Sequence, residues 1–134
     1  MSVLRLPEIN RVLVSGRLTR DPERRWAADG TAVTGFTLAF HRHFRARDGR
    51  VTEHTGFVPV ASYQRLAEVC GEALRKGSPV LVEGRLQMRE WTTREGRRQT
   101  RLEIRAELVH FLEKAEGAPE TASIPLDADA DDVS

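Results

Sequence analysis

Two seven-residue stretches of this chain are nearly identical. Residues 12–18 (Val-Leu-Val-Ser-Gly-Arg-Leu) and residues 80–86 (Val-Leu-Val-Glu-Gly-Arg-Leu) agree at six of seven positions, although their flanks diverge too far for a tandem repeat. An aliphatic, β-branched start is typical of a buried strand, and a glycine in mid-strand marks a bulge or the tight bend of a barrel corner. Arginines follow each stretch: Arg20, Arg24 and Arg25 after the first and Arg89 after the second. The pair predicts a small β-barrel whose bent strands carry charge outward.

Length and cysteine content restrict the class of protein. A chain of 134 residues is enough for one core and too short for two ordinary ones. No apolar run approaches the roughly 20 residues that cross a bilayer, and residues 1–8 have no apolar stretch of signal-peptide length. The single cysteine, Cys70, excludes an internal disulfide and a paired-cysteine metal site. These features predict one cytoplasmic domain with no membrane association.

The charge is distributed unevenly. Residues 113–134 contain one basic and seven acidic residues, a net charge of −6, and the remaining 20 basic and 13 acidic residues give residues 1–112 a net charge of +7. A basic body with an acidic tail is typical of a protein that binds a polyanion. The tail then either competes with the polyanion for the basic surface or binds a partner protein. Nineteen of the 21 basic residues are arginine. Its planar guanidinium group donates two parallel hydrogen bonds to a phosphate and stacks on bases. A GC-rich genome would produce the same excess of arginine.

The periodicity of apolar residues predicts five main strands and one helix. Phe36, Leu38, Phe40 and Phe44 recur with the period of a strand, whereas apolar residues from Tyr63 to Leu74 recur at three and four, the spacing of an amphipathic helix. We expect Ser62 to cap that helix, Cys70 to lie on its packing face, and Pro59 to mark an edge or bulge. The predicted strands are 10–18, 32–44, 51–60, 79–92 and 98–112, with a short extension at 24–26.

This order of elements defines a fold class. Five strands with one helix between the third and the fourth is the order of the oligonucleotide/oligosaccharide-binding (OB) fold, a Greek-key barrel. The sequence thus predicts an all-β OB-fold domain over residues 1–112 with long projecting hairpins. Residues 113–134 are poor in apolar side chains and rich in Ala, Pro, Glu and Asp, so we expect a disordered acidic tail.

Two predicted hairpins, residues 41–50 and 89–101, interleave arginine with aromatic residues. An aromatic ring near a projecting tip offers a face on which a base can stack, worth about 1 to 3 kcal/mol, and arginines around it neutralise phosphates. Because duplex bases hide their faces, this pattern indicates a single-strand site. The alternative is a solvated hairpin in which Trp91 packs on an arginine stem. The presence of two such hairpins favours the binding of single strands over the solvated alternative.

Three histidines raise the question of a metal site. If Asp48-Gly49 forms a two-residue turn, His43 lies opposite His54, with His41 on the same face, and three imidazoles within reach could hold zinc. No carboxylate or thiolate at ligand spacing supports them, so we favour a polar hairpin face and predict no metal and no cofactor. No nucleophile with a base, phosphate-binding glycine loop or carboxylate pair is evident, so we predict no enzyme activity.

Several motifs, in this order and spacing, resemble the bacterial single-stranded DNA-binding protein family. They are Asn10-Arg11-Val12, Gly16-Arg17-Leu18-Thr19-Arg20-Asp21-Pro22-Glu23, Gly30-Thr31-Ala32-Val33, Phe36-Thr37-Leu38-Ala39, Leu66-Ala67-Glu68, Leu74-Arg75-Lys76-Gly77-Ser78, Glu83-Gly84-Arg85-Leu86 and Trp91. The resemblance covers about residues 10–112. It implies an OB-fold protein, usually a homotetramer, that wraps single-stranded DNA in replication, recombination and repair.

The resemblance also implies site residues. The base-stacking aromatics of the family fall on Phe44, Phe57, Tyr63 and Trp91. Our candidates for phosphate contacts are Arg17, Arg42, Arg85, Arg89 and Arg98. The chain ends without the Pro-Phe tip through which relatives recruit other proteins, so replication or repair partners at the acidic tail are the weakest expectation. The alternatives are an accessory OB-fold protein, similar to primosomal relatives, that acts mainly through protein contacts, and a histidine-dependent metal protein.

Overall fold

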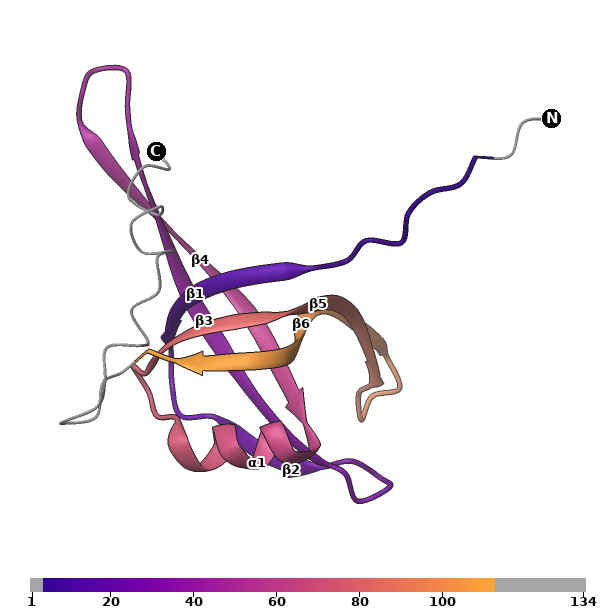
Figure 1. The fold of residues 1–134 in the computed structure, drawn as a ribbon. Coiled ribbons are helices and arrows are strands. Elements are labelled where there is room, and N and C mark those ends of the chain that lie inside the picture. The colour runs from indigo at the N-terminus through magenta and orange to yellow at the C-terminus, as the bar shows by residue number, and fades with distance from the viewer. Residues whose placement is uncertain (1–3, 113–134) are drawn as a thin grey trace.

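The computed structural model describes residues 4–112. They form a strongly bent sheet with one helix at one end (Figure 1). The predicted tail, residues 113–134, lies outside the described residues. The elements in chain order are β1 (Val12–Leu18), β2 (Glu23–Trp26), β3 (Ala32–Arg45), β4 (Val51–Tyr63), α1 (Gln64–Ala73), β5 (Pro79–Thr92) and β6 (Arg98–Phe111). Within residues 4–112 no helix has the length and apolarity needed to cross a membrane.

Five of the six strands form a closed barrel. The strand order is β1-β5-β6-β4-β3, and β1 closes it by pairing with β3 at Arg17↔Ala39 and Leu18↔Leu38. The pairing of β4 with β6 is parallel and the other pairings are antiparallel. The short strand β2 pairs with β3 outside the barrel. This topology confirms the predicted five-stranded barrel with one helix between its third and fourth strands.

The core lies between the barrel strands and α1. Leu38, Val60 and Ile104 are almost fully buried on the inner faces of three strands, and Cys70 of α1 packs into the same cluster. Because α1 follows β4 at one end of the barrel, its buried residues cover the end of the core there (Figure 1). The predicted packing role of Cys70 is confirmed.

The predicted cap of α1 is wrong. The Ser62 hydroxyl donates to the Thr34 carbonyl at 2.9 Å, because β4 continues to Tyr63 and keeps Ser62 in the sheet. Tyr63 is the N-cap residue and makes no side-chain capping bond. The chain then turns into α1 through Gln64, whose φ is +60°.

Three hairpins close with the same kind of loop. The N–H of the first loop residue donates to the carbonyl of the fifth in 27–31, 46–50 and 93–97, and the fourth residue is a glycine with φ between 85° and 90°. In the β3–β4 hairpin three residues therefore lie between the hydrogen-bonded Ala46 and Arg50, instead of the two we predicted at Asp48-Gly49. In the β3–β4 hairpin this places His43 opposite Glu53 and His54 opposite Arg42.

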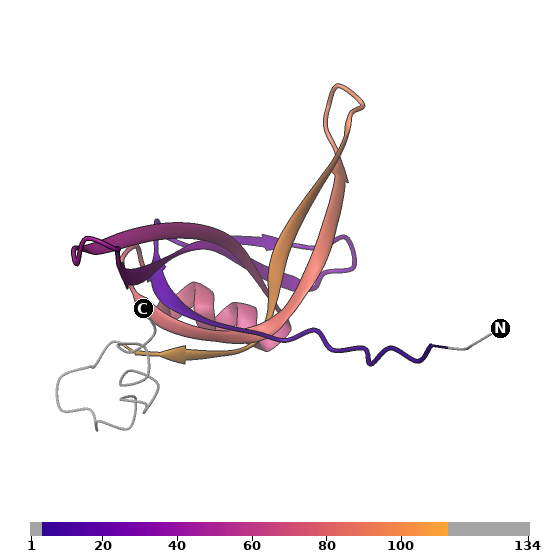
Figure 2. The ribbon, with the colours of Figure 1, turned by 90° about the horizontal axis from the view of Figure 1, so that it is seen from above.

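The two long hairpins leave the barrel in different directions. β3–β4 extends from one side, and β5–β6 bends away from the opposite side (Figures 1 and 2). The bend in β5–β6 coincides with a register shift at Glu83/Gly84, where Glu107 is the extra residue on β6. The bulge expected from the glycine of residues 80–86 is confirmed.

The glycines of both matching stretches lie where two backbones almost touch. A Cβ on Gly16 would lie 2.1 Å from the Ala39 carbonyl oxygen, and one on Gly84 would lie 2.1 Å from the carbonyl oxygen of Arg105. Neither obstacle is a flexible side chain, so the backbones themselves would have to separate.

We therefore expect Gly84→Ala to lower the free energy of unfolding by about 1 to 3 kcal/mol, the usual cost of overpacking. Denaturant unfolding measures the change. Gly35→Ala is the matched control, because its Cβ would meet only the Val60 carbonyl oxygen at 3.6 Å, an ordinary contact. Equal stability of the two variants would show that the close approach at Gly84 does not limit the fold.

Candidate nucleic-acid interface

The alternation of side chains assigns each candidate residue to a face of the sheet. Cross-strand partners share a face. Phe36, paired with Val60, and Ile104, paired with Leu86, mark the inner face. Odd-numbered residues of β3 and β4, and of β5 and β6 beyond the bulge, therefore lie on the outer face.

Three of the four predicted aromatics share this outer face. Phe57 is 64% exposed on β4, and Trp91 is 37% exposed on β5 with the Arg89 guanidinium 5.2 Å from its ring centre. Tyr63 is half-buried at the end of β4, with the Arg105 guanidinium 4.1 Å from its ring centre. The outer face thus presents aromatic rings beside guanidinium groups.

The fourth aromatic, Phe44, lies on the opposite face of the β3–β4 hairpin. It shares that face with Arg42, whose guanidinium is 5.5 Å from the ring centre, and with His54, whose ring meets Phe44 edge-on at 4.8 Å. The structure therefore does not group Phe44 and Arg42 with Phe57, Tyr63 and Trp91.

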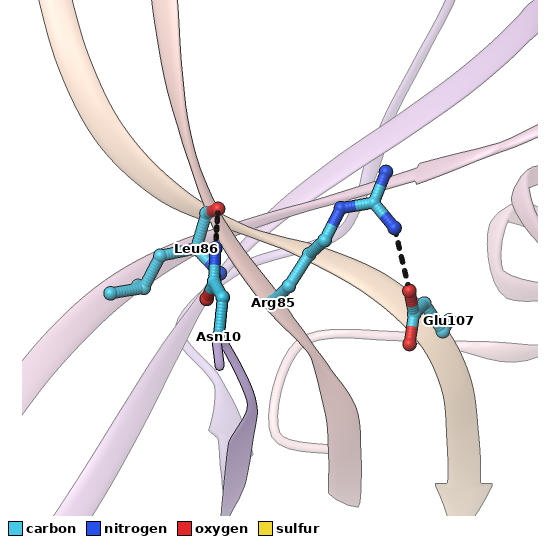
Figure 3. Close-up of polar contacts among 4 residues, drawn as sticks. All are labelled: Asn10, Arg85, Leu86 and Glu107. Atoms are coloured by element: carbon cyan, nitrogen blue, oxygen red, sulfur yellow. Dashed lines mark hydrogen bonds and ion pairs between the residues drawn. The ribbon is translucent and has the colours of Figure 1, made fainter. Parts of the chain in front are cut away.

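The predicted arginines also divide. Arg85 and Arg89 lie on the outer face, but Arg85 forms an ion pair of 2.7 Å with Glu107 (Figure 3). Arg98 lies on the hairpin face opposite to Trp91 and contacts Glu90 at 3.4 Å. Arg17 donates to the Gly77 carbonyl at 2.8 Å, near the end of α1. Arg89 has no carboxylate within ion-pair distance among residues 4–112.

A hollow of about 230 Å³ opens on the outer face between the two hairpins and the β1–β2 loop. Four arginines line it, and only one of them, Arg89, is among the predicted phosphate contacts. The other three are Arg20, Arg25 and Arg101. Arg101 was missed because only the hairpin register places it directly opposite Arg89. Its spacing of four from Arg105 along β6, an even number, is the one sequence signal that indicates their shared face.

The base of the β5–β6 hairpin is fixed by the N-terminal segment. The Asn10 side-chain amide donates to the Leu86 carbonyl at 2.9 Å and accepts from the Leu86 N–H at 2.8 Å, which continues the contact of the two chain segments beyond the last β1–β5 pair, Val12↔Gly84 (Figure 3). The Arg85–Glu107 pair bridges the bulge beside it. Both contacts lie where β5 leaves the barrel, so they hold the hairpin that carries Trp91.

The three histidines do not converge. His41 and His43 share a face with Glu53, whose Oε2 lies 3.6 Å and 3.3 Å from their ring nitrogens, whereas His54 lies on the other face beside Phe44. The three-residue loop shifts the register by one position and so separates the proposed ligands. In the part of the chain that the structure describes, no group of three or more His, Cys, Asp or Glu residues could hold a metal ion.

The closed five-stranded barrel, with aromatic and basic side chains on one outer face beside a long hairpin, defines a protein of the OB-fold class. The model of the single-strand binding protein family matches residues 9–112. The chain belongs to this family.

Individual relatives agree with this assignment. The chain is 42% identical to single-stranded DNA-binding protein 2 of Chlorobaculum tepidum, over 81% of this chain and 74% of that protein. It is 39% identical to the single-stranded DNA-binding protein of Caldanaerobacter subterraneus, over 92% and 83% of the two chains. It is similar to a crystal structure of a deletion mutant of the single-stranded DNA binding protein from Thermus aquaticus, with a TM-score of 0.68 and 32% identity over 78% of this chain. The aligned region spans about half (51%) of that solved chain.

The only cysteine offers no reactive nucleophile. Cys70 is fully buried, and burial raises the pKa of its thiol to about 11. We expect 5,5′-dithiobis(2-nitrobenzoate) to leave the thiol unmodified in folded protein at pH 8 and to modify it rapidly in denaturant. Absorbance of the released thiolate measures both rates. Equally rapid modification in the folded protein would contradict the burial.

Proposed function

We propose that this protein binds single-stranded DNA without sequence preference, during replication, recombination and repair. The placement of Phe57, Tyr63 and Trp91 on one outer face, beside Arg85 and Arg89, is the observation that carries this proposal. Rings of this kind can stack with any base whose face is exposed, and bases in a duplex expose none. The proposed activity is binding without a chemical step, and it places the protein with the DNA of the cytoplasm, at the nucleoid.

The phosphates of the strand are assigned to the arginines of the same face. Arg89 and Arg101 face each other across the β5–β6 hairpin, and Arg20 and Arg25 line the hollow from the β1–β2 side. Guanidinium groups that neutralise phosphates release counterions, so affinity falls as salt rises, with a slope of about −0.7 for each phosphate of a single strand. These contacts read no base identity and therefore give no sequence preference.

The remaining predicted residues extend the proposed path. Phe44 with Arg42, and Arg98 near the tip of β5–β6, lie on the other faces of the two hairpins. A strand that passes around the hairpins would reach them after it leaves the outer face. Arg17 is assigned to a phosphate near the end of α1.

The first experiment follows the anisotropy of labelled oligo-dT, duplex of the same length and oligo-U at low and moderate salt. We expect tight, salt-sensitive binding of oligo-dT and little response to duplex.

We expect Trp91→Ala to weaken oligo-dT binding about 5- to 150-fold, the equivalent of 1 to 3 kcal/mol for one stacked base. The matched control is Trp26→Ala, because Trp26 is 71% exposed and β2 pairs it with Ala32, away from the outer face of the site. Equal effects of the two variants, or none, would contradict the stacking role, and weak, indiscriminate binding by the unmodified protein would favour the accessory, protein-contacting role.

We also propose that the chain forms a homo-oligomer, with a tetramer as the expected state. Leu13 and Leu108 flank Glu83 across three paired strands and are 56% and 47% exposed. From Val12 to Gly16, β1 pairs with β5 on one side only. Exposed leucines beside an open strand edge are typical of a contact surface between copies.

Sedimentation velocity tests this assembly. We expect the unmodified protein to sediment as an oligomer and Leu108→Asp to shift it toward smaller species, because a buried carboxylate without a partner opposes the contact. Leu102→Asp is the control, since Leu102 is 52% exposed on the β5–β6 hairpin. A monomeric unmodified protein, or the same shift in both variants, would contradict the assigned surface.

A further inference from the structure

A carboxylate lies almost completely buried beside the proposed binding face. Glu103 of β6 is 1% exposed, and it is the only charged side chain among the buried residues of the described chain. A carboxylate in this position costs several kcal/mol unless its oxygens accept hydrogen bonds. Glu103 Oε1 lies 3.5 Å from a guanidinium nitrogen of Arg101, at the limit of hydrogen-bond distance, and Oε2 accepts a shorter bond, so the partner at Oε2 indicates what the carboxylate does.

The carboxylate holds one amide in a fixed orientation. Glu103 Oε2 accepts a hydrogen bond of 2.8 Å from Gln87 Nε2, and the same nitrogen donates to the Tyr63 hydroxyl oxygen at 3.1 Å. An ionised carboxylate accepts and cannot donate, so it requires the nitrogen of the Gln87 amide, not the oxygen, to face it. Both N–H groups of this nitrogen are then used, one for Glu103 and one for Tyr63.

Tyr63 is thereby held at two points. Gln87 fixes its hydroxyl group, and the guanidinium of Arg105, 4.1 Å from the ring centre, covers one face of the ring. Arg105 stands next to Ala61 in the parallel β4–β6 pairing, so the sheet itself fixes its backbone. A ring held in this way loses little conformational freedom when a second flat group stacks on it.

We infer that Glu103 is a positioning residue, which orients Tyr63 through Gln87 so that the Tyr63–Arg105 pair forms a preorganised platform for one nucleobase. This inference rests on the proposed binding of single-stranded DNA and identifies what sets one stacking position. Glu103 itself does not contact the base, since only 1% of it is exposed. The inference gives a function to the one charged side chain among the buried residues of the described chain.

A double-mutant cycle between Glu103→Gln and Tyr63→Phe tests the connection. Glu103→Gln keeps the shape of the side chain but removes the requirement for a donor, so the Gln87 amide can turn. Tyr63→Phe keeps the ring and removes the hydroxyl group. We expect each variant to weaken oligo-dT binding about three- to tenfold, as for the loss of one hydrogen bond, and the double variant to bind no more weakly than either single one.

The other possible roles of Glu103 give different results. A carboxylate that acted only through its charge would repel the DNA, so Glu103→Gln would strengthen binding in both backgrounds. A merely structural carboxylate would lower the midpoint of thermal unfolding and give additive losses of affinity. Either result would overturn the inference. Glu68→Gln, an exposed position of α1, is the charge-matched control and should leave affinity within about twofold.

A second measurement, by NMR, follows the mobility of the Tyr63 ring directly. Tyr63 is the only tyrosine of the chain, so selectively ¹³C-labelled tyrosine gives signals from this ring alone. We expect Glu103→Gln to shift and sharpen these signals in protein without DNA, as the ring becomes more mobile, and unchanged signals would overturn the inference. If Glu103→Gln does not fold, Gln87→Met replaces it in both measurements, since it breaks the connection at its middle. Failure of the unmodified protein to bind oligo-dT would instead reject the proposed function, and the ring signals would still test the positioning.

Discussion

The geometry of this protein depends on two places where one backbone lies against another. At Gly16 and Gly84 a single added carbon would lie 2.1 Å from a carbonyl oxygen of the neighbouring strand. These approaches let β1 reach β3 and close the barrel, and let β5 bend outward at the bulge. Closure and bending together place the β5–β6 hairpin beside the outer face of β4. The glycines thus act on binding indirectly, because they determine where Trp91 lies relative to Phe57 and Tyr63.

Register is the second determinant of the site. Because side chains alternate along a strand, a loop one residue longer moves every side chain of its partner strand to the other face. In the β3–β4 hairpin, the three-residue loop closed by Gly49 separates His54 from His43 and places it beside Phe44. The same register puts Phe57 and Tyr63 on the face opposite to Phe44. The composition of the hairpin therefore does not decide which aromatics act together, and the length of its loop does.

Local patterns were sufficient to predict the fold but not the exact arrangement of the site. The period of two in β3, the period of three and four in α1, and the matching glycines depend on neighbours in the chain, and they gave the correct strands and order. The prediction that Ser62 caps α1 is wrong because its hydroxyl group is hydrogen-bonded to the carbonyl of Thr34, 28 residues earlier, and not to the helix. The Tyr63–Gln87–Glu103 network joins three strands, so no local pattern could reveal it. Arg85 illustrates the same limit, since the sequence indicates its charge but not the ion pair with Glu107 that occupies it.

The ability of the hollow to attract an anion depends on whether its carboxylates are already hydrogen-bonded within the protein. Asp21 accepts from the backbone N–H of Lys76 at 2.8 Å, and Glu103 accepts from Gln87, so two of the three carboxylates that line the hollow are engaged with the protein itself. Arg20, Arg25 and Arg89 form no ion pair among the described residues and keep their guanidinium groups available to a ligand. A hollow with nearly equal numbers of acidic and basic residues can therefore still attract a polyanion. What matters is which charges are already paired, and the sheet register determines that pairing.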